Sequence, residues 1–283
     1  AMGLWGPNRS VETTAFRFSS PPSRPTYWSA TRNIGLLFSE ETDLSPEDAR
    51  RLNAFDRVFA GSRWNLAVLV RGGLAEHRGG VFPQGVDTDL FKSPLQIQQA
   101  DIPSMYRIPD TEKFFDIFSG GKLELRKGQD IVLAAFARFA RSHPDARLVV
   151  AWDNKWNDTV ATVLESPHTR GMPAMREGGI LDLAPWLAAN GVPPGRVIDL
   201  GSVPHPLMPA VFSQVDVALF PNRCEGGTNL VAMEAVAAGV PAVLSANTGH
   251  LDLIARVGAP NVLVLRDDEG DEEEEGGAEE GPG

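Results

Sequence analysis

The sequence predicts an α/β fold that is built from parallel sheets in two parts. Short apolar runs that end in Gly, Ser, Glu or Pro alternate with segments of helical period along most of the 283 residues. Strands that alternate with helices favour a parallel sheet covered on both faces. A polar stretch at 92–113, which contains three prolines, interrupts the alternation and predicts a linker between two domains.

The part before the linker is predicted to be an incomplete α/β domain at 34–91. Residues 1–33 are rich in Pro, Ser and Arg without a clear period, so we expect an irregular segment there. Between the first two strands, Ser45 is a good helix N-cap, followed by Pro46 at the first helical position and by Asp48. The expected strands of this part are 34–40, 56–62 and 80–86.

The part after the linker, 114–266, shows the same alternation more strongly. The segment 128–143 places its apolar residues on one face of a helix. Further helices are expected at 183–191, 207–214, 229–239 and 250–256. The expected strands are 115–123, 146–152, 196–202, 215–221, 241–246 and 261–266.

The charge of the chain is concentrated at its C-terminal end. The formal net charge is -11, but the segment 267–283 contains ten carboxylates and no Lys or Arg, which leaves about -1 for residues 1–266. A nearly neutral body argues against binding to nucleic acid or to an anionic membrane surface, because both need a basic face. The acidic segment has almost no apolar side chain to bury, so we expect it to be disordered.

Residue usage also restricts the cellular setting and the metal chemistry. The single cysteine, Cys224, cannot form an internal disulfide, which fits a reducing compartment such as the cytoplasm. We find no secretory signal at the N-terminus and no apolar run long enough for a transmembrane helix. The five histidines show no metal-ligand spacing, so no metal site is expected.

The segment 119–130 carries the first candidate binding residues. A predicted strand ends in Gly120 and Gly121, and Lys122 and Lys127 follow before the next helix. Glycines allow a ligand to approach the backbone closely, and ligands of parallel α/β sheets bind at the carboxyl ends of strands. Two ammonium groups at this position suit a diphosphate. The alternative is that both lysines are ordinary solvated charges at the start of a helix.

The second candidate segment is 221–241, where a predicted strand leads through a Gly-Gly-Thr-Asn loop into a helix. Successive backbone N–H groups at a helix N-terminus form an anion site. Glu225 precedes the loop, and Glu234 lies in the helix among small apolar residues. A carboxylate in such surroundings needs hydrogen-bond partners, which the vicinal hydroxyls of a ribose would supply. The alternative is that Glu234 is partly exposed at the polar edge of the helix.

Together these two segments resemble the retaining GT-B glycosyltransferases of family four, also called glycosyl transferases group one. A Gly-Arg…Lys-Gly segment is typical of that family, and here Lys122 replaces the usual Arg whereas Lys127 is the expected Lys. Two glutamates eight positions apart around a glycine-rich loop are also typical, and Glu225 and Glu234 are nine apart. Further similarity covers the segments 56–65 and 81–91.

The resemblance implies two Rossmann-like domains that face a cleft, with the N-terminal domain incomplete. It implies transfer of a sugar from a nucleotide-diphosphate donor with retained anomeric configuration. Lys122, Lys127 and Glu225 would be the catalytic residues, and Glu234 would hold the ribose. The implied donor-binding residues are Gly120, Gly121, Lys122, Lys127, Glu225, Gly226, Gly227, Thr228, Asn229, Leu230 and Glu234.

The nucleotide sugar is the expected substrate, and no separate cofactor is expected. Because two ammonium groups can neutralise a leaving diphosphate, the reaction should not need a metal ion. The acceptor could be a carbohydrate, a lipid or a protein. Two alternatives share the donor site: a sugar-nucleotide epimerase on the same fold, and a donor-binding module or fragment without catalysis.

Overall fold

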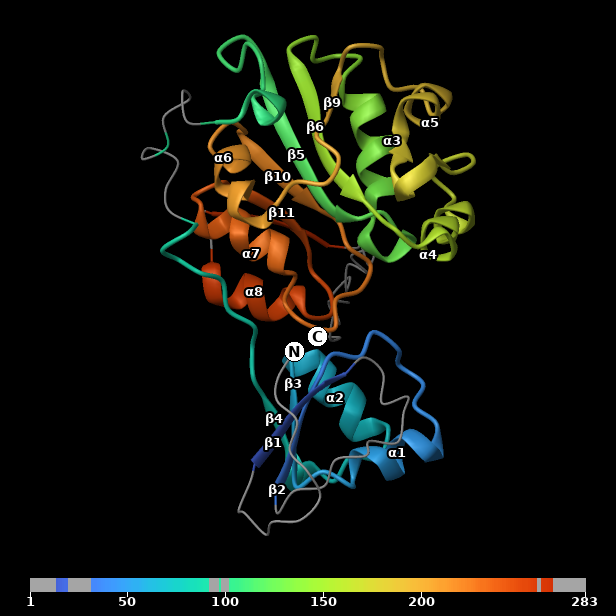
Figure 1. Cartoon of the computed structure of the whole chain (residues 1–283), viewed down its shortest axis with the longest axis vertical. Coiled ribbons are helices and arrows are strands. Elements are labelled where there is room, and N and C mark those ends of the chain that lie inside the picture. Colours follow the sequence, from blue (N-terminus) through green and yellow to red (C-terminus); the bar gives the residue numbers. More distant parts are fainter. Residues whose placement is uncertain (1–13, 20–31, 92–96, 98–101, 259–260, 267–283) are drawn as a thin grey trace, which may run out of the picture.

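The computed structural model describes residues 14–19, 32–91, 97, 102–258 and 261–266. Figure 1 shows two units, each with its own sheet: an N-terminal unit formed by the described residues between 14 and 91, and a C-terminal unit formed by those between 102 and 266. Most of the predicted segment 1–33 and all of the acidic segment 267–283 lie outside the described residues. No helix of the described part is long and apolar enough to cross a membrane.

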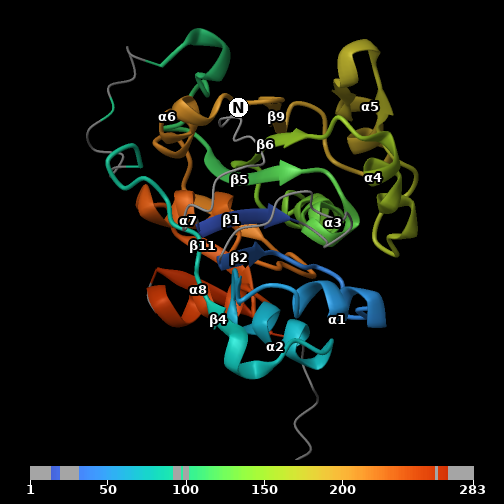
Figure 2. The ribbon, with the colours of Figure 1, turned by 60° about the horizontal axis from the view of Figure 1, so that its bottom comes forward.

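The N-terminal unit contains one parallel sheet with strands in chain order. Its strands are β1 (Thr14–Ser19), β2 (Arg32–Leu37), β3 (Arg57–Ala60) and β4 (Gly79–Val81). Its helices are α1 (Pro46–Leu52), α2 (Arg63–Arg71) and the 3-10 turn η1 (Glu76–Arg78). Both α-helices lie on the same side of the sheet (Figures 1 and 2). There Leu52 of α1 and Leu69 of α2 join Leu37 and Val58 in one core cluster.

Strand β1 corrects part of the prediction that residues 1–33 are irregular. The six residues pair with β2 in parallel register, from Thr14 opposite Arg32 to Ser19 opposite Leu37. The only local signal for a strand was the alternation of Phe16, Arg17 and Phe18, which is too short to predict a strand. Pairing with a neighbouring strand supplies the backbone hydrogen bonds that define β1.

Helix α1 begins as predicted, whereas helix α2 was not predicted. Ser45 accepts a hydrogen bond from the Asp48 N–H at 3.2 Å, and the Asp48 carboxylate accepts one from the Ser45 N–H at 3.1 Å, which forms a capping box. For α2, the Ser62 hydroxyl accepts from the Asn65 N–H at 3.1 Å. Ser62 was assigned to the end of the preceding strand, and its capping role was missed.

The C-terminal unit contains a six-stranded parallel sheet in the order β12-β11-β10-β5-β6-β9. Each of the six predicted strands is present. Their bounds are β5 (Phe115–Lys122), β6 (Ala146–Asp153), β9 (Val197–Asp199), β10 (Val217–Phe220), β11 (Ala242–Ser245) and β12 (Val262–Leu265). A separate antiparallel pair, β7 (Ala174–Met175) and β8 (Leu181–Asp182), was not predicted.

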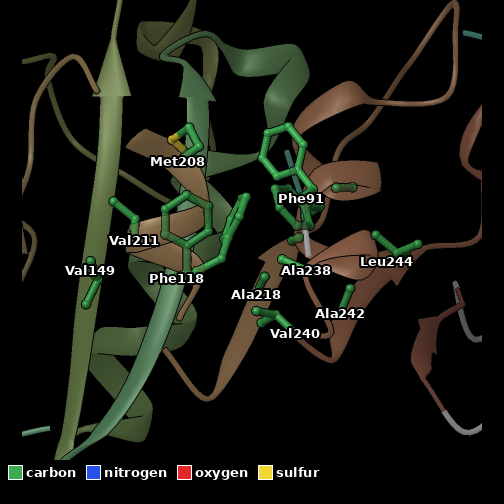
Figure 3. Packing of buried hydrophobic residues seen from close by; sticks show 14 of the residues in the cluster. Phe91, Phe118, Val149, Met208, Val211, Ala218, Ala238, Val240, Ala242 and Leu244 are labelled. Atoms are coloured by element: carbon green, nitrogen blue, oxygen red, sulfur yellow. The ribbon is translucent and has the colours of Figure 1, made fainter. Parts of the chain in front are cut away.

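Helices cover both faces of the six-stranded sheet, as the alternation predicts. The helices are α3 (Gln129–Phe139), α4 (Asn157–Ala161), α5 (Leu183–Ala189), α6 (Met208–Phe212), α7 (Leu230–Ala237) and α8 (His250–Val257). The 3-10 turns are η4 (Ser104–Tyr106), η5 (Leu125–Lys127), η6 (Thr162–Glu165), η7 (Glu177–Gly179) and η8 (His205–Leu207). Neighbouring residues of one strand belong to opposite cores: Phe118 packs with α6 and α7, whereas Ile117 packs with α3 and α5 (Figures 1 and 3).

Part of the predicted linker at 92–113 belongs to the core of the C-terminal unit. Ile102, Tyr106 and Ile108 are buried and join the cluster of Figure 3. The Gln214 side chain fixes this segment, because its amide accepts from the Ile108 N–H at 2.8 Å and donates to the Tyr106 carbonyl at 3.0 Å. The prolines at 92–113 were the basis for predicting a linker, and they gave no sign of this packing.

The two units contact each other through the loops at the carboxyl ends of their strands. The Ser62 hydroxyl, just after β3, donates to the Gly226 carbonyl at 2.9 Å. The Arg63 N–H donates to the Asp252 carboxylate of α8 at 2.8 Å. The carboxyl edges of both sheets therefore meet, and this is the region where both predicted binding segments lie.

Candidate functional site

The loop between β10 and α7 forms the centre of the candidate site. Asn229 has a φ of 62°, and its side chain caps α7 by accepting a hydrogen bond from the Ala232 N–H. The loop is packed tightly, because a Cβ at Gly226 would press on the Ser39 carbonyl of the N-terminal unit. At Gly227 a Cβ would press on Gln84. The two glycines therefore allow the backbones of the two units to approach each other.

The segment 245–250, which connects β11 to α8, packs against the glycine loop at 225–229. The Thr248 hydroxyl accepts from the Glu225 N–H at 2.9 Å, and the Gly249 N–H donates to the Glu225 carbonyl at 2.9 Å. A Cβ at Gly249 would overlap the Gly227 carbonyl oxygen, so only glycine fits at this approach. We call residues 245–250 the supporting loop. Sequence analysis did not predict its role.

His250 completes the support from the first position of α8. Its ring is fully buried. The Asn229 side-chain amide lies 3.1 Å from Nε2, and Nδ1 lies 3.2 Å from the Ser245 carbonyl oxygen. These contacts fit a neutral ring in which Nδ1–H donates and Nε2 accepts. Burial, with a smaller contribution from the nearby Lys127, lowers the pKa of His250 to about 4, against the raising effects of Glu225 and of the Ser245 carbonyl.

The Glu225 carboxylate lies at the centre of a buried charge cluster. The Lys127 ammonium lies 2.6 Å from one carboxylate oxygen, and the Arg126 guanidinium lies 3.3 Å from the other. The Asn222 side-chain amide also donates to this carboxylate. Burial alone would raise the pKa of Glu225, but Lys127 and Arg126 more than offset it, so the pKa lies below its ordinary value.

Arg126 connects this cluster to the N-terminal unit. Its guanidinium lies 2.6 Å from Glu124 and 2.9 Å from Glu40, which follows β2. It also donates to the Cys224 carbonyl at 2.9 Å. Burial raises the pKa of Glu40, which Arg126 and Lys127 partly offset. The candidate site therefore holds two cations against three carboxylates, one of which comes from the other unit.

Arg126 was not among the predicted site residues, and the predicted residue Lys122 does not join the charge cluster around Glu225. Lys122 is exposed, and its ammonium lies over the ring of Trp156, 4.6 Å from the ring centre, rather than beside Glu225. The signal for Arg126 was present, because it adjoins Lys127 at the same helix start. Arg126 and Lys127 lie in the turn η5, which directs them towards the loop after β10.

A second set of contacts holds the segments after β5 and β10 together. The Arg223 guanidinium donates twice to the buried Asp130 carboxylate, at 2.7 Å each, and once to the Leu125 carbonyl at 2.7 Å. The Arg223 N–H donates to the Arg126 carbonyl at 2.8 Å. A Cβ at Gly128 would overlap the Pro221 carbonyl, so the close approach of these two backbone segments requires a glycine at position 128.

The predicted glycines at the end of β5 have different roles. Gly121 has a φ of 117°, a backbone conformation that residues with a side chain rarely adopt. A Cβ there would meet nothing within 4 Å. A Cβ at Gly120 would instead press on the Phe118 ring and approach Val231 of α7. Gly120 therefore allows packing, and Gly121 allows the left-handed backbone conformation near the end of β5.

The remaining predicted residues lie in α7 or just before it. Thr228 is buried and donates to the Met233 sulfur at 2.8 Å, whereas Leu230 is partly exposed at the first turn. Glu234 is buried, and its carboxylate lies 2.9 Å from Nε2 of His205. Burial raises the pKa of Glu234 above its ordinary value, although His205 lowers it in part. Glu234 thus has a partner, and it is separate from the charge cluster of Glu225.

A cavity of about 260 Å³ lies at the same carboxyl edge. Trp152, which lines it, pairs with Gly121 in the ladder between β5 and β6. The other lining residues are Asp153, Lys155, Gly178, Gly179, Ile180, Leu181, Asp199, Gly201 and Ser202. Within the described part of the chain, no group of three or more His, Cys, Asp or Glu side chains could hold a metal ion.

The charges and polar groups of this site suit an anionic ligand that carries further polar groups on either side of its charge. Two cations lie at a glycine turn, a buried carboxylate lies one helix turn further on, and a cavity opens between neighbouring strand ends. Of the predicted set, Lys127, Glu225 and the loop 226–229 lie together, whereas Lys122 and Glu234 lie apart from the cluster.

Comparison with solved structures identifies the fold. HepE of Anabaena, solved in complex with UDP and glucose, matches with a TM-score of 0.60 and 18% identity over 83% of this chain and 58% of that chain. Sucrose-phosphate synthase from Thermosynechococcus elongatus matches with a TM-score of 0.62 and 18% identity, over 84% and 55%. A UDP-forming trehalose-phosphate synthase from Burkholderia xenovorans gives a TM-score of 0.59 and 19% identity, over 83% and 57%.

These similarities establish a GT-B fold, with two parallel-sheet units, as the sequence predicts. The chain spans somewhat more than half the length of the solved proteins that it matches. No curated protein sequence matches it. The sequence profile of one family, glycosyl transferases group 1, matches residues 115–274, which is more than half of the chain. The chain therefore belongs to the glycosyl transferases group 1 family.

Proposed function

We propose that this chain binds a nucleotide-diphosphate sugar and transfers the sugar to an acceptor with retention of the anomeric configuration. The observation that carries the proposal is the convergence of Lys127 and Arg126 on Glu225, beside a glycine turn at the carboxyl edge of the sheet. Membership of the family supports a transferase. The sugar, the acceptor and the stereochemistry are parts of the proposal.

The two cations have the charge and position that a diphosphate needs. A diphosphate would compete with Glu225, Glu40 and Glu124 for Lys127 and Arg126. At an effective dielectric constant near 20, one cation about 4 Å from a unit negative charge contributes about 4 kcal/mol. Because negative charge grows on the leaving diphosphate during transfer, both cations would stabilise the transition state more than the ground state. Transfer would then need no metal ion.

The neighbouring groups suit the other parts of the donor. Glu234 can accept hydrogen bonds from the vicinal hydroxyls of a ribose. The cavity at Trp152 and Ser202 lies near the same strand ends and has both apolar and polar lining, which suits a nucleoside base. Arg126 is better placed than Lys122 to provide the second positive charge. Lys122 would reach the donor only after leaving the ring of Trp156.

Calorimetric titration of the full chain with UDP, GDP and ADP tests the donor site. UDP is the first choice, because HepE and a trehalose-phosphate enzyme of E. coli were solved with UDP or a UDP-sugar. Lys127→Ala and Arg126→Ala should each weaken binding at least about tenfold, since each removes a charge-assisted hydrogen bond. Lys122→Ala should have a smaller effect.

Lys113→Ala is the matched control. Lys113 is an exposed lysine that pairs with Asp110 just before β5, at the opposite end of the strand that leads to the site. Its variant should bind like the wild type. If folded wild-type protein binds none of the three nucleotides at about 1 mM, the proposed donor site is wrong.

Product analysis then separates transfer from its alternatives. With a UDP-sugar and a panel of acceptors, proton NMR of the product reports whether the anomeric configuration is retained. An epimerase would convert the donor without an acceptor. A donor-binding module would bind the nucleotide and give no product in either reaction. Inversion of configuration would contradict the retaining mechanism.

A further inference from the structure

His205 lies where it can control the geometry of Glu234. It begins the turn η8, in the loop that leads from β9 to α6, and its Nε2 lies 2.9 Å from Oε1 of Glu234. In the described part of the structure, this is the only hydrogen bond shown for the Glu234 side chain. The His205 side chain is 60% exposed, whereas that of Glu234 is 9% exposed.

The position of His205 is fixed by its surroundings rather than by its own burial. Pro204 and Pro206 flank it, and the Leu207 N–H closes the turn on the Pro204 carbonyl at 2.8 Å. On one side its ring packs against the ring of Phe91 in an edge-to-face arrangement, with ring centres 5.3 Å apart. Phe91 is buried in the core cluster of Figure 3. The imidazole is therefore held between a rigid aromatic ring and a carboxylate.

This contact contributes little to the stability of the fold. An ion pair or hydrogen bond with one largely exposed partner is screened by water and adds little to the free energy of unfolding. Its effect on the carboxylate is different, because a single contact to Oε1 restricts the side-chain torsions of Glu234. Oε2 then has one preferred direction, which a freely rotating carboxylate would lack.

We propose that His205 is a positioning residue of the donor site: it holds Oε1 of Glu234 so that Oε2 faces the vicinal hydroxyls of the ribose. This inference rests on the proposed function, since it assumes that a nucleotide binds here. His205 donates from Nε2–H in its neutral form and needs no proton transfer to act. It does not contact the reacting atoms, so it changes donor recognition rather than chemistry.

Calorimetry with UDP and with 2′,3′-dideoxy-UDP tests this role, because the second probe lacks the hydroxyls that Glu234 would bind. Wild-type protein should bind UDP more tightly than the dideoxy compound. His205→Ala should weaken UDP binding about tenfold and leave the dideoxy compound unaffected, because only the ordered carboxylate is lost. His205→Gln keeps a terminal N–H donor and should recover most of the affinity for UDP.

His143→Ala is the control, because His143 is exposed and follows α3 at the opposite edge of the sheet. If His205→Ala discriminates between the two probes as well as wild type does, or weakens both equally, the positioning role is wrong. If wild type binds both probes equally, Glu234 does not recognise the ribose hydroxyls, and the inference fails while the donor site stands. Absence of any UDP binding by folded wild type would instead overturn the proposed function for a uridine donor.

Discussion

The buried His250 should make the stability of this protein depend on pH in a way that one substitution removes. Its ring supports the glycine loop through Asn229 and must stay neutral to accept that hydrogen bond. Burial lowers its pKa to about 4 in the folded state, against 6.5 as the ordinary value. His250→Gln keeps one side-chain donor and one acceptor but does not titrate, so it isolates the effect of protonation.

The sign and size of this pH dependence follow from the pKa of His250 in the folded chain and its ordinary value. Between pH 6.5 and pH 4 the unfolded chain binds a proton at this ring and the folded chain does not, so stability is complete above pH 6.5 and falls as the pH is lowered. The loss is about 2 kcal/mol between pH 7.5 and pH 5, and it approaches about 3 kcal/mol below pH 4. Several carboxylates with raised pKa values act in the opposite direction, among them Glu234.

Urea denaturation of wild type and His250→Gln at pH 7.5 and pH 5 measures this effect. For each protein the change in the free energy of unfolding between the two pH values is determined, and the two changes are compared. The free energy of unfolding of the wild type should fall by about 2 kcal/mol more than that of the variant over this range. His143→Gln serves as the control, because it makes the same substitution at an exposed histidine at the opposite edge of the sheet. An equal pH dependence in wild type and His250→Gln, or an NMR titration of the His250 ring near 6.5, would refute the reasoning.

Two further predictions concern the supporting loop and the acidic segment. Gly249→Ala should displace the loop at Gly227, since the new methyl group overlaps its carbonyl oxygen. It should therefore lower the melting temperature by several degrees and abolish UDP binding, whereas Gly191→Ala, where the added Cβ meets nothing within 4 Å, should keep UDP binding. Deletion of 267–283 should leave the melting temperature nearly unchanged, as monitored by circular dichroism, because this segment has almost no apolar side chain. A drop of several degrees would mean that the segment packs against the folded part.

Local sequence signals predicted most of the secondary structure. The capping box at Ser45 and Asp48 involves residues three positions apart, and the strands of the C-terminal unit show their apolar runs within a few residues. Such signals depend on backbone geometry inside one element, so they can be read without the fold. The prediction was incomplete at β1, where the local signal was too short. It was also incomplete at Ser62, which follows a strand and also caps the next helix.

The chain order also determined that the segments at 119–130 and 221–241 follow strands of one parallel sheet, and hence that both end at its carboxyl edge. Lys127, Glu225 and the glycine loop were found in this way, without knowledge of the strand order. Their role as donor contacts stays a prediction. The GT-B fold followed from the motifs together and is confirmed by the solved structures.

The partners of each side chain were decided only by the tertiary structure. Because β10 lies next to β5 in the sheet, residues about a hundred positions apart meet, and Arg126 rather than Lys122 reaches Glu225. The same holds for His205 beside Glu234. Strand order and the direction of a turn such as η5 depend on the packing of the whole unit. A linear pattern therefore gives the edge at which a residue lies, and the packed fold alone gives the atoms it contacts.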